Sequence, residues 1–168
     1  PEFIEAPNWR KSGIDILNRE IKKQVYDDGG QYELDLGYHG GCIGIFSNAL
    51  NMAKVNGYGK EFPDSYANTI KKMMMFSINT YFPDYTFPCF SDAKRAKPFS
   101  LVRNYQRWSE LFPEDEQLRY FATQGKKGKQ PTWLCHASAN SGFFTFRNGW
   151  GQDATVMILK AGPKAEWH

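Results

Sequence analysis

The sequence predicts a helical region followed by the start of a β-domain, and three observations support this prediction. Apolar residues recur at spacings of three and four through the first 112 residues. Further along, residues 143–146 and 154–159 form β-rich runs. The stretch 125–131 between these regions has the Lys, Gly and Pro content of a linker. Helices in series followed by strands in series predict two domains, residues 1–130 and 131–168.

The first predicted helix follows Pro7, with Asn8 as its expected N-cap. It ends in the turn 27–30, whose sequence is Asp-Asp-Gly-Gly. An extended segment, residues 31–36, comes next. The apolar residues of the helix fall on one face: Ile14, Leu17, Ile21 and Val25.

A second helix is predicted from near Gly40 to the pair Asn56-Gly57, and a third from Asp64 to about Tyr81. Within the third helix, the run 73–75 consists of three methionines. We interpret this run as adaptable core and not as a ligand site, because Met side chains fill irregular gaps well.

A fourth helix is predicted from Ser100 through Phe112, and a fifth from the acidic run 114–116 to Gly125. The stretch 82–98 before them is rich in aromatic residues and proline. It is long for a connection inside a helical domain, which makes it a candidate binding loop.

The two β-rich runs are joined by residues 149–153, which have the composition of a turn. Two strands alone do not form a stable sheet, so we expect the β-domain to be cut short. The chain starts at Pro1, and no signal segment follows. We therefore expect it to be a piece of a longer protein.

The formal net charge of +3 is mild, which argues against a nucleic-acid-binding protein. No run of eighteen apolar residues predicts a membrane span. The three cysteines contain no CxxC pair, so buried free thiols are expected instead of a zinc motif or a closed disulfide framework. Basic residues gather in clusters that suit either a polyanionic ligand or a solvated surface: Lys94, Arg95 and Lys97; Arg103 and Arg107; Lys126, Lys127 and Lys129.

The pair Tyr38-His39 lies at the predicted mouth of the second helix, between glycines that let the backbone turn and a ligand approach. Either the phenol faces a cleft, or the pair packs at the helix start. His136 and His168 stand alone in the sequence, as hydrogen-bonded structural histidines commonly do. None of the common nucleotide, hydrolase or metalloprotease motifs is present, so these residues alone do not specify a reaction.

Several motifs in order resemble the heparinase II/III family of polysaccharide lyases. Each string is weak by itself, and the resemblance rests on their ordered combination from about residue 8 to the last residue. The motifs are Asn8-Trp9-Arg10, Asp28-Gly29, Gln31-Tyr32-Glu33-Leu34 with Tyr38-His39, Phe87-Pro88 through Ser91-Asp92, Arg147 to Trp150, Asp153-Ala154, Lys160 to Pro163, and Glu166-Trp167-His168.

This resemblance implies the C-terminal part of an incomplete (α/α) toroid followed by the first strands of an antiparallel β-sandwich, with the substrate between them. It implies cleavage of heparan sulfate or a related acidic glycosaminoglycan by β-elimination at a uronic acid. Tyr38 matches the family's proton-transfer residue and His168 its partner, 130 residues away in sequence. The expected substrate-binding or supporting residues are His39, Gln31, Glu33, Asp92, Lys94, Arg95, Arg103 and Arg107.

The sequence also departs from the family pattern. The stretch 35–37 is Asp-Leu-Gly, and Asp35 places a negative charge near an anionic substrate. The family's carboxylate-neutralising Asn has no match, so we expect this chain alone to be inactive. No metal or other cofactor is assigned to these residues, and the resemblance leaves room for a divalent metal in the remainder of the β-domain.

Two other functions stay open: a lyase for another uronate polymer, such as alginate or an unsulfated glycosaminoglycan, and a non-catalytic glycan-binding protein. The basic clusters favour a sulfated polymer, because Arg and Lys bind dense anions by charge-assisted hydrogen bonds. The expected partner is an acidic polysaccharide, with no nucleic acid and no membrane. By analogy with the family, the expected location is periplasmic or secreted.

Overall fold

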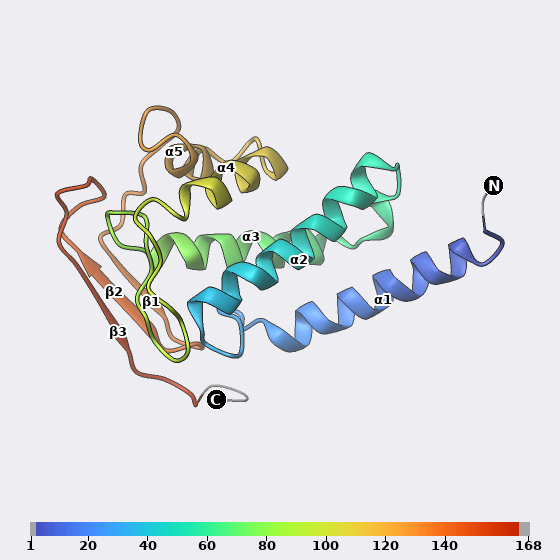
Figure 1. Ribbon diagram of the computed structural model, residues 1–168, viewed down its shortest axis with the longest axis horizontal. Helices are drawn as coiled ribbons and strands as arrows, with labels where there is room; N and C mark the ends of the chain where they lie inside the picture. The colour runs from blue at the N-terminus through green and yellow to red at the C-terminus, as the bar shows by residue number, and fades with distance from the viewer. Residues whose placement is uncertain (1–2, 165–168) are drawn as a thin grey trace.

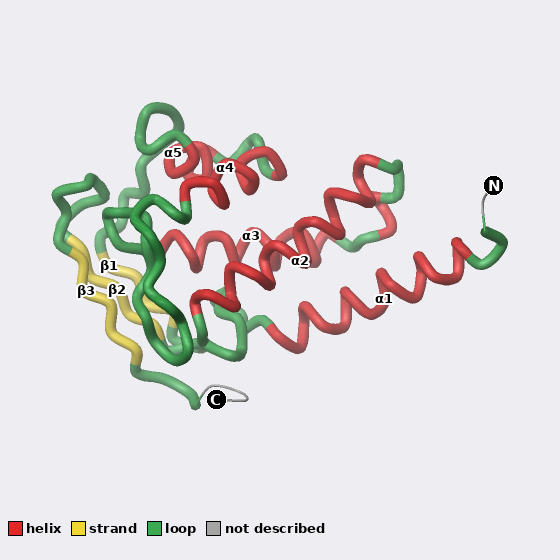
Figure 2. The backbone as a smooth tube through the Cα atoms, in the orientation of Figure 1, coloured by secondary structure: helices red, strands yellow, loops and turns green. Residues whose placement is uncertain are grey.

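The computed structural model describes residues 3–164, and these residues form a helical segment followed by a small sheet (Figures 1 and 2). The confirmed part of the predicted fold class is this order, helices and then an antiparallel sheet. The toroid, the sandwich and the division into two domains stay predictions. The helices are α1 (Ala6–Gln24), α2 (Leu36–Val55), α3 (Asp64–Asn79), α4 (Val102–Leu111) and α5 (Glu116–Ala122), with a 3-10 turn at Gly59–Glu61.

Helix α1 begins earlier than predicted. Its N-cap is Glu5, and Pro7 lies in the first turn, where a missing N–H leaves no partner unsatisfied. The prediction of Asn8 as the cap is therefore wrong. Asn8 lies inside the helix, and its side-chain amide donates a hydrogen bond to the Glu5 carboxylate at 2.8 Å.

Helix α2 also begins before its predicted start near Gly40. It starts at Leu36, with Asp35 as the N-cap. The predicted extended segment 31–36 is a tight turn, in which Gln31 alone forms a bridge, to Val25. The correction places Tyr38 inside the first turn of a helix, whereas the sequence suggested a position before it.

The helical core is made largely of the predicted apolar faces. Ile14 and Ile21 of α1 are buried in one cluster with residues of α2 and α3, and Met73 and Met74 are fully buried, as expected. Large aromatic side chains complete the core. Three tyrosines, Tyr66, Tyr81 and Tyr105, are at most 1 % exposed, and burial raises the pKa of each above its ordinary value.

Residues 80–101 form a long connection without helix or strand, in agreement with the predicted loop. Helices α4 and α5 follow it and pack against each other. Both are shorter than predicted. Of the three cysteines, all with free thiols, Cys42 is half-buried while Cys89 and Cys135 are exposed, so the expectation of buried thiols is wrong for two of them.

The sheet has three antiparallel strands in the order β1 (Cys135–Ser138), β2 (Phe143–Arg147) and β3 (Val156–Lys160). Strands β2 and β3 correspond to the two predicted runs, and β1 was not predicted. In register, Cys135 stands opposite Phe146, which stands opposite Met157. The side chains of Phe146 and Met157 are exposed on the outer face of the sheet.

The sheet is anchored to the end of α3 by polar contacts. The Trp133 indole N–H donates to the side-chain oxygen of Asn79 at 2.9 Å, and the Arg147 guanidinium donates to the Asn79 carbonyl at 3.0 Å. The same guanidinium stacks 3.8 Å above the Trp150 ring, which lies in the helical core. Figure 1 shows the consequence, in which the start of α2 and the end of α3 both lie beside the sheet.

Candidate active site

Tyr38 is presented to solvent on the first turn of α2. Asp35 fixes this turn, because one of its carboxylate oxygens accepts hydrogen bonds from the backbone N–H groups of Gly37 at 2.8 Å and of Tyr38 at 2.9 Å. Such capping satisfies N–H groups that have no partner within the helix. Asp35 itself is 1 % exposed, whereas Tyr38 is 48 % exposed. The cap therefore sets the backbone position of an accessible phenol.

Asp35 was interpreted from sequence as a negative charge near the substrate. In the structure its carboxylate is buried beneath the helix start as the N-cap, and its nearness to a substrate stays a prediction. Its second carboxylate oxygen has no hydrogen-bond partner within residues 3–164. The signal for the cap was available in the sequence, since an Asp directly before an apolar helical run is a common helix start.

His39, the next residue of the same turn, is buried. Its Nε2 is 2.9 Å from the carbonyl oxygen of Met73, and its ring packs 4.9 Å from the ring of Phe76. A carbonyl accepts only, so Nε2 carries the proton and donates it. Burial lowers the pKa of His39 to about 4. The ring is therefore neutral at pH 7 and attaches the helix that carries Tyr38 to α3.

Gln31 and Glu33 build the turn that leads into α2. The Gln31 amide donates to the Glu33 carboxylate at 3.0 Å, and the Gln31 side-chain oxygen accepts from the Glu33 backbone N–H at 3.0 Å. Gln31 is 1 % exposed. These contacts make Gln31 a structural support of the turn, and its predicted role at the substrate stays a prediction.

The α1–α2 turn is tied to the sheet by Asp28. One Asp28 carboxylate oxygen accepts from the backbone N–H and the hydroxyl of Ser141, at 2.8 and 3.1 Å, and the other accepts from the Gly30 N–H at 3.1 Å. The sequence placed Asp28 in the turn after the first helix and in a family motif, with no indication of a contact with the sheet. Because the two residues are 113 positions apart, no local sequence pattern indicates this contact.

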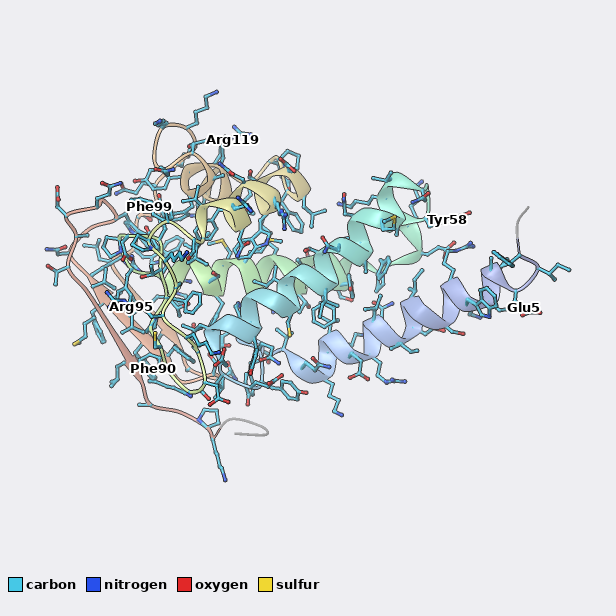
Figure 3. All side chains as sticks on the ribbon, viewed as in Figure 1. Glu5, Tyr58, Phe90, Arg95, Phe99 and Arg119 are labelled. Carbon is cyan, nitrogen blue, oxygen red and sulfur yellow. The ribbon has the colours of Figure 1, made fainter. Side chains whose placement is uncertain are left out.

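The candidate binding loop is attached to the site by an apolar cluster. Leu34, Leu36, Phe76 and Phe143 form the buried cluster under the start of α2, and Phe90 of the loop packs against it. Figure 3 shows Phe90 and Arg95 on this loop beside the sheet. The loop and the first turn of α2 therefore share one support.

The predicted cationic residues divide into two groups. Arg95 lines a groove between the loop and the β2–β3 turn, together with Phe87 and Gln152. Lys94 and Asp92 are exposed on the same loop. The second group, exposed Arg103 and Arg107, lies on α4, and Arg107 lines a different groove between α4 and α2.

Of the two remaining histidines, the structure describes His136. His136 on β1 lines a groove with Asp28 and Asn79, and partial burial lowers its pKa. His168, the predicted partner of Tyr38, lies outside the described residues, as do Glu166 and Trp167. Within residues 3–164, no group of three or more His, Cys, Asp and Glu side chains is arranged to hold a metal ion. No helix in this range is long and apolar enough to cross a membrane.

Comparison with known proteins gives consistent matches over the chain. The family model described as Heparinase II/III N-terminus matches residues 1–120. A heparin-sulfate lyase of Bacteroides stercoris is 56 % identical, and one of Pedobacter heparinus is 46 % identical, each over all 168 residues. The chain spans 25 % and 26 % of the length of these two relatives.

Solved structures match with the same coverage. A heparinase III structure superimposes with a TM-score of 0.94 at 58 % identity, over the whole chain and 26 % of its own. The crystal structure of a heparan sulfate lyase from Pedobacter heparinus gives a TM-score of 0.93 at 46 % identity, again over the whole chain and 26 % of its own.

Proposed function

The chain belongs to the heparinase II/III family, and we propose that the complete gene product carrying it is a polysaccharide lyase acting on heparan sulfate or a related acidic glycosaminoglycan. The support is that the matched relatives are named heparin-sulfate lyases and that the chain matches them along its whole length. The chain spans about a quarter of these relatives, so the reaction is proposed for the complete protein.

The proposed reaction is β-elimination at a uronic acid. A base removes the proton on the carbon next to the carboxylate, and the electron pair left behind forms a carbon–carbon double bond. The bond to the glycosidic oxygen breaks, and an acid gives that oxygen a proton. Charge accumulates on the carboxylate during the first step, so the site must supply positive charge or hydrogen-bond donors there.

Tyr38 is proposed as the group that transfers the proton. The observation that carries this assignment is the exposure of Tyr38 on a turn whose backbone is fixed by Asp35 and which the next residue, His39, attaches to α3. A catalytic group is effective when its position is set before the substrate arrives. His168 is proposed as its partner, on the family resemblance alone.

The cations of the loop and of α4 are proposed to hold the polymer. Arg95 lies in a groove with the aromatic side chain of Phe87, which suits a sugar ring carrying a sulfate or carboxylate. Arg103 and Arg107 are one helical turn apart on α4, so both can meet the same anionic chain.

The test is to follow ultraviolet absorbance of the unsaturated uronate product when the complete gene product is incubated with heparan sulfate. Tyr38→Phe removes only the phenol oxygen, and we expect it to lower the rate about 100- to 10,000-fold. Tyr58→Phe is the matched control. Tyr58 is also an exposed tyrosine, and the Arg10 guanidinium stacks 3.8 Å above its ring, so the ring contact survives the change.

Other outcomes distinguish the remaining functions. A rise on alginate or hyaluronan, but not on heparan sulfate, would keep the mechanism and change the substrate. Binding of heparan sulfate with no absorbance rise on any uronate polymer would replace the lyase by a glycan-binding protein. Equal rates for Tyr38→Phe and Tyr58→Phe would assign the proton transfer to another residue.

A further inference from the structure

A groove of about 350 Å³ runs between helices α2 and α4, and its lining is mainly polar. From α2 it receives Asn48 and Asn51, and from α4 it receives Asn104 and Arg107. It begins at Gly40, in the turn that follows Tyr38. Of these groups only Arg107 was predicted to bind substrate.

The three amides and the guanidinium have hydrogen-bonding capacity that the protein does not use. Within residues 3–164, none of the side chains of Asn48, Asn51, Asn104 and Arg107 has a hydrogen-bond or ion-pair partner. Converging donors and acceptors of this kind favour a polar ligand over a second apolar surface.

We propose that this groove is a saccharide subsite that holds one acidic unit of the polysaccharide. Side-chain amides donate to and accept from sugar hydroxyl and N-acyl groups, and the Arg107 guanidinium pairs with a carboxylate or sulfate. The carboxylate of Glu110 also lines the groove and accepts from hydroxyls. Trp108 and Leu111 give it an apolar side for sugar C–H groups. The subsite rests on the proposed function for the identity of the polymer.

Glycines leave the α2 side of the groove open. A Cβ atom placed on Gly40 or Gly44 would meet no heavy atom within 4 Å. Glycine inside a helix costs about 1 kcal/mol relative to alanine, so packing within α2 gives no reason for it here. Because Gly44 lines the groove and an added Cβ meets no neighbour, a larger side chain at position 44 is expected to project into the groove.

This openness provides the test. Binding of sized heparan sulfate oligosaccharides to the complete gene product is measured by isothermal titration, in a Tyr38→Phe background that blocks cleavage. We expect Gly44→Leu to raise the dissociation constant at least tenfold by filling the groove. Gly13→Leu is the matched control, because Gly13 is also a helical glycine with no heavy atom within 4 Å of an added Cβ.

A second variant tests the charge. Arg107→Gln removes the groove cation, and we expect it to weaken binding about as much as Gly44→Leu. Lys22→Gln removes one exposed cation from α1 and should leave the affinity within twofold. Equal affinities of Gly44→Leu and Gly13→Leu, or of the two charge variants, would overturn the subsite.

Two further results separate a saccharide subsite from a groove filled by protein and from a failure of the lyase assignment. If Gly44→Leu lowers the melting temperature of the complete protein and Gly13→Leu does not, a protein segment occupies the groove and the subsite is wrong. If the unsubstituted complete protein shows no lyase activity but the groove variants weaken binding, the proposed function fails and the subsite stands.

Discussion

The start of α2 and the α2–α4 groove lie on the same helix and are built in opposite ways. Around Tyr38 each polar side chain makes at least one bond to the protein: Asp35 to the helix backbone, His39 to Met73 and Gln31 to Glu33. One Asp35 carboxylate oxygen and Nδ1 of His39 have no partner within residues 3–164. In the groove, the side chains of three asparagines and of Arg107 have no partner within the described residues.

This difference separates two requirements of a polysaccharide site. A proton-transfer group must be held at a fixed position before the substrate arrives, which requires internal bonds around it. A subsite for a sugar must offer hydrogen bonds that only the ligand completes. Substitutions near Tyr38 should therefore cost stability, whereas those in the groove should spare it and affect binding.

The largest loss of stability is expected from a substitution that disrupts the turn before α2. Gly29 has φ of +92°, and an added Cβ would lie 2.3 Å from the backbone oxygen of Lys72. We expect Gly29→Ala to lower the free energy of unfolding by about 3 kcal/mol or more. The measurement is urea unfolding of the 168-residue chain. Gly57→Ala is the control, since Gly57 also has positive φ but open space around it, and its loss should be about 1 kcal/mol. Equal losses would show that the contact with Lys72 relaxes at no cost.

The second prediction concerns how the stability of the chain depends on pH through the buried His39. His39 has its pKa lowered to about 4 in the folded protein, and an unfolded histidine titrates near 6.5. Between these values the unfolded chain binds the additional proton, so stability is lost as pH falls from 6.5 to 4. The expected loss is roughly 3 kcal/mol. Urea midpoints between pH 7 and pH 4 should fall more steeply for the unsubstituted chain than for His39→Gln. Parallel curves would mean that His39 does not titrate in this range.

The third prediction separates capping from positioning. Asp35 caps α2 and Asp115 caps α5 in the same way, each accepting from two backbone N–H groups. Replacing either by Ala should lower stability by about 1 kcal/mol. Only Asp35→Ala should lower kcat on heparan sulfate, with KM little changed, because only that cap sets the position of Tyr38. Asp35→Asn keeps an acceptor oxygen and should restore most of kcat. An equal fall in kcat for both Ala variants would remove the positioning role.

The smallest effect is expected for the stability of a variant with a substitution in the α2–α4 groove. Gly44→Ala should raise the free energy of unfolding by up to about 1 kcal/mol, because the helix gains a better helix former and the added Cβ meets nothing. Gly13→Ala in α1 should give a similar gain. Urea midpoints of both variants check this expectation. A loss at Gly44 alone would indicate that the groove is filled from within the chain.

The sequence was most informative where periodicity is local. The buried faces of α1, α2 and α3 follow from apolar spacing, and the pair β2–β3 follows from aromatic and β-branched runs. The start of α2 was misplaced because the glycines at 37, 40 and 41 suggested a break, whereas the Asp35 cap stabilises a helix through them. Strand β1 was missed because its sequence, Cys-His-Ala-Ser, has no β-branched or aromatic residue. Pairing with β2 makes it a strand.

In the candidate site too, features local in sequence were predicted and contacts between distant segments were not. The neighbours of Tyr38 along the chain were predicted, since Gln31, Glu33 and His39 lie within seven residues of it. The groove was not, because Asn48 and Asn104 are brought together only by the packing of helices that are far apart in sequence. The bond between Asp28 and Ser141 was missed for the same reason.

The Asp28–Ser141 contact also sets an order of events during synthesis. The turn before α2 leaves the ribosome first, and its carboxylate must wait for a partner 113 residues later. At about 5–20 residues per second, that wait is roughly 6 to 23 s. Helices α1, α2 and α3 can associate during this interval, while the turn that leads to Tyr38 stays incomplete until the sheet emerges. The geometry of this turn is therefore completed only after the sheet has docked.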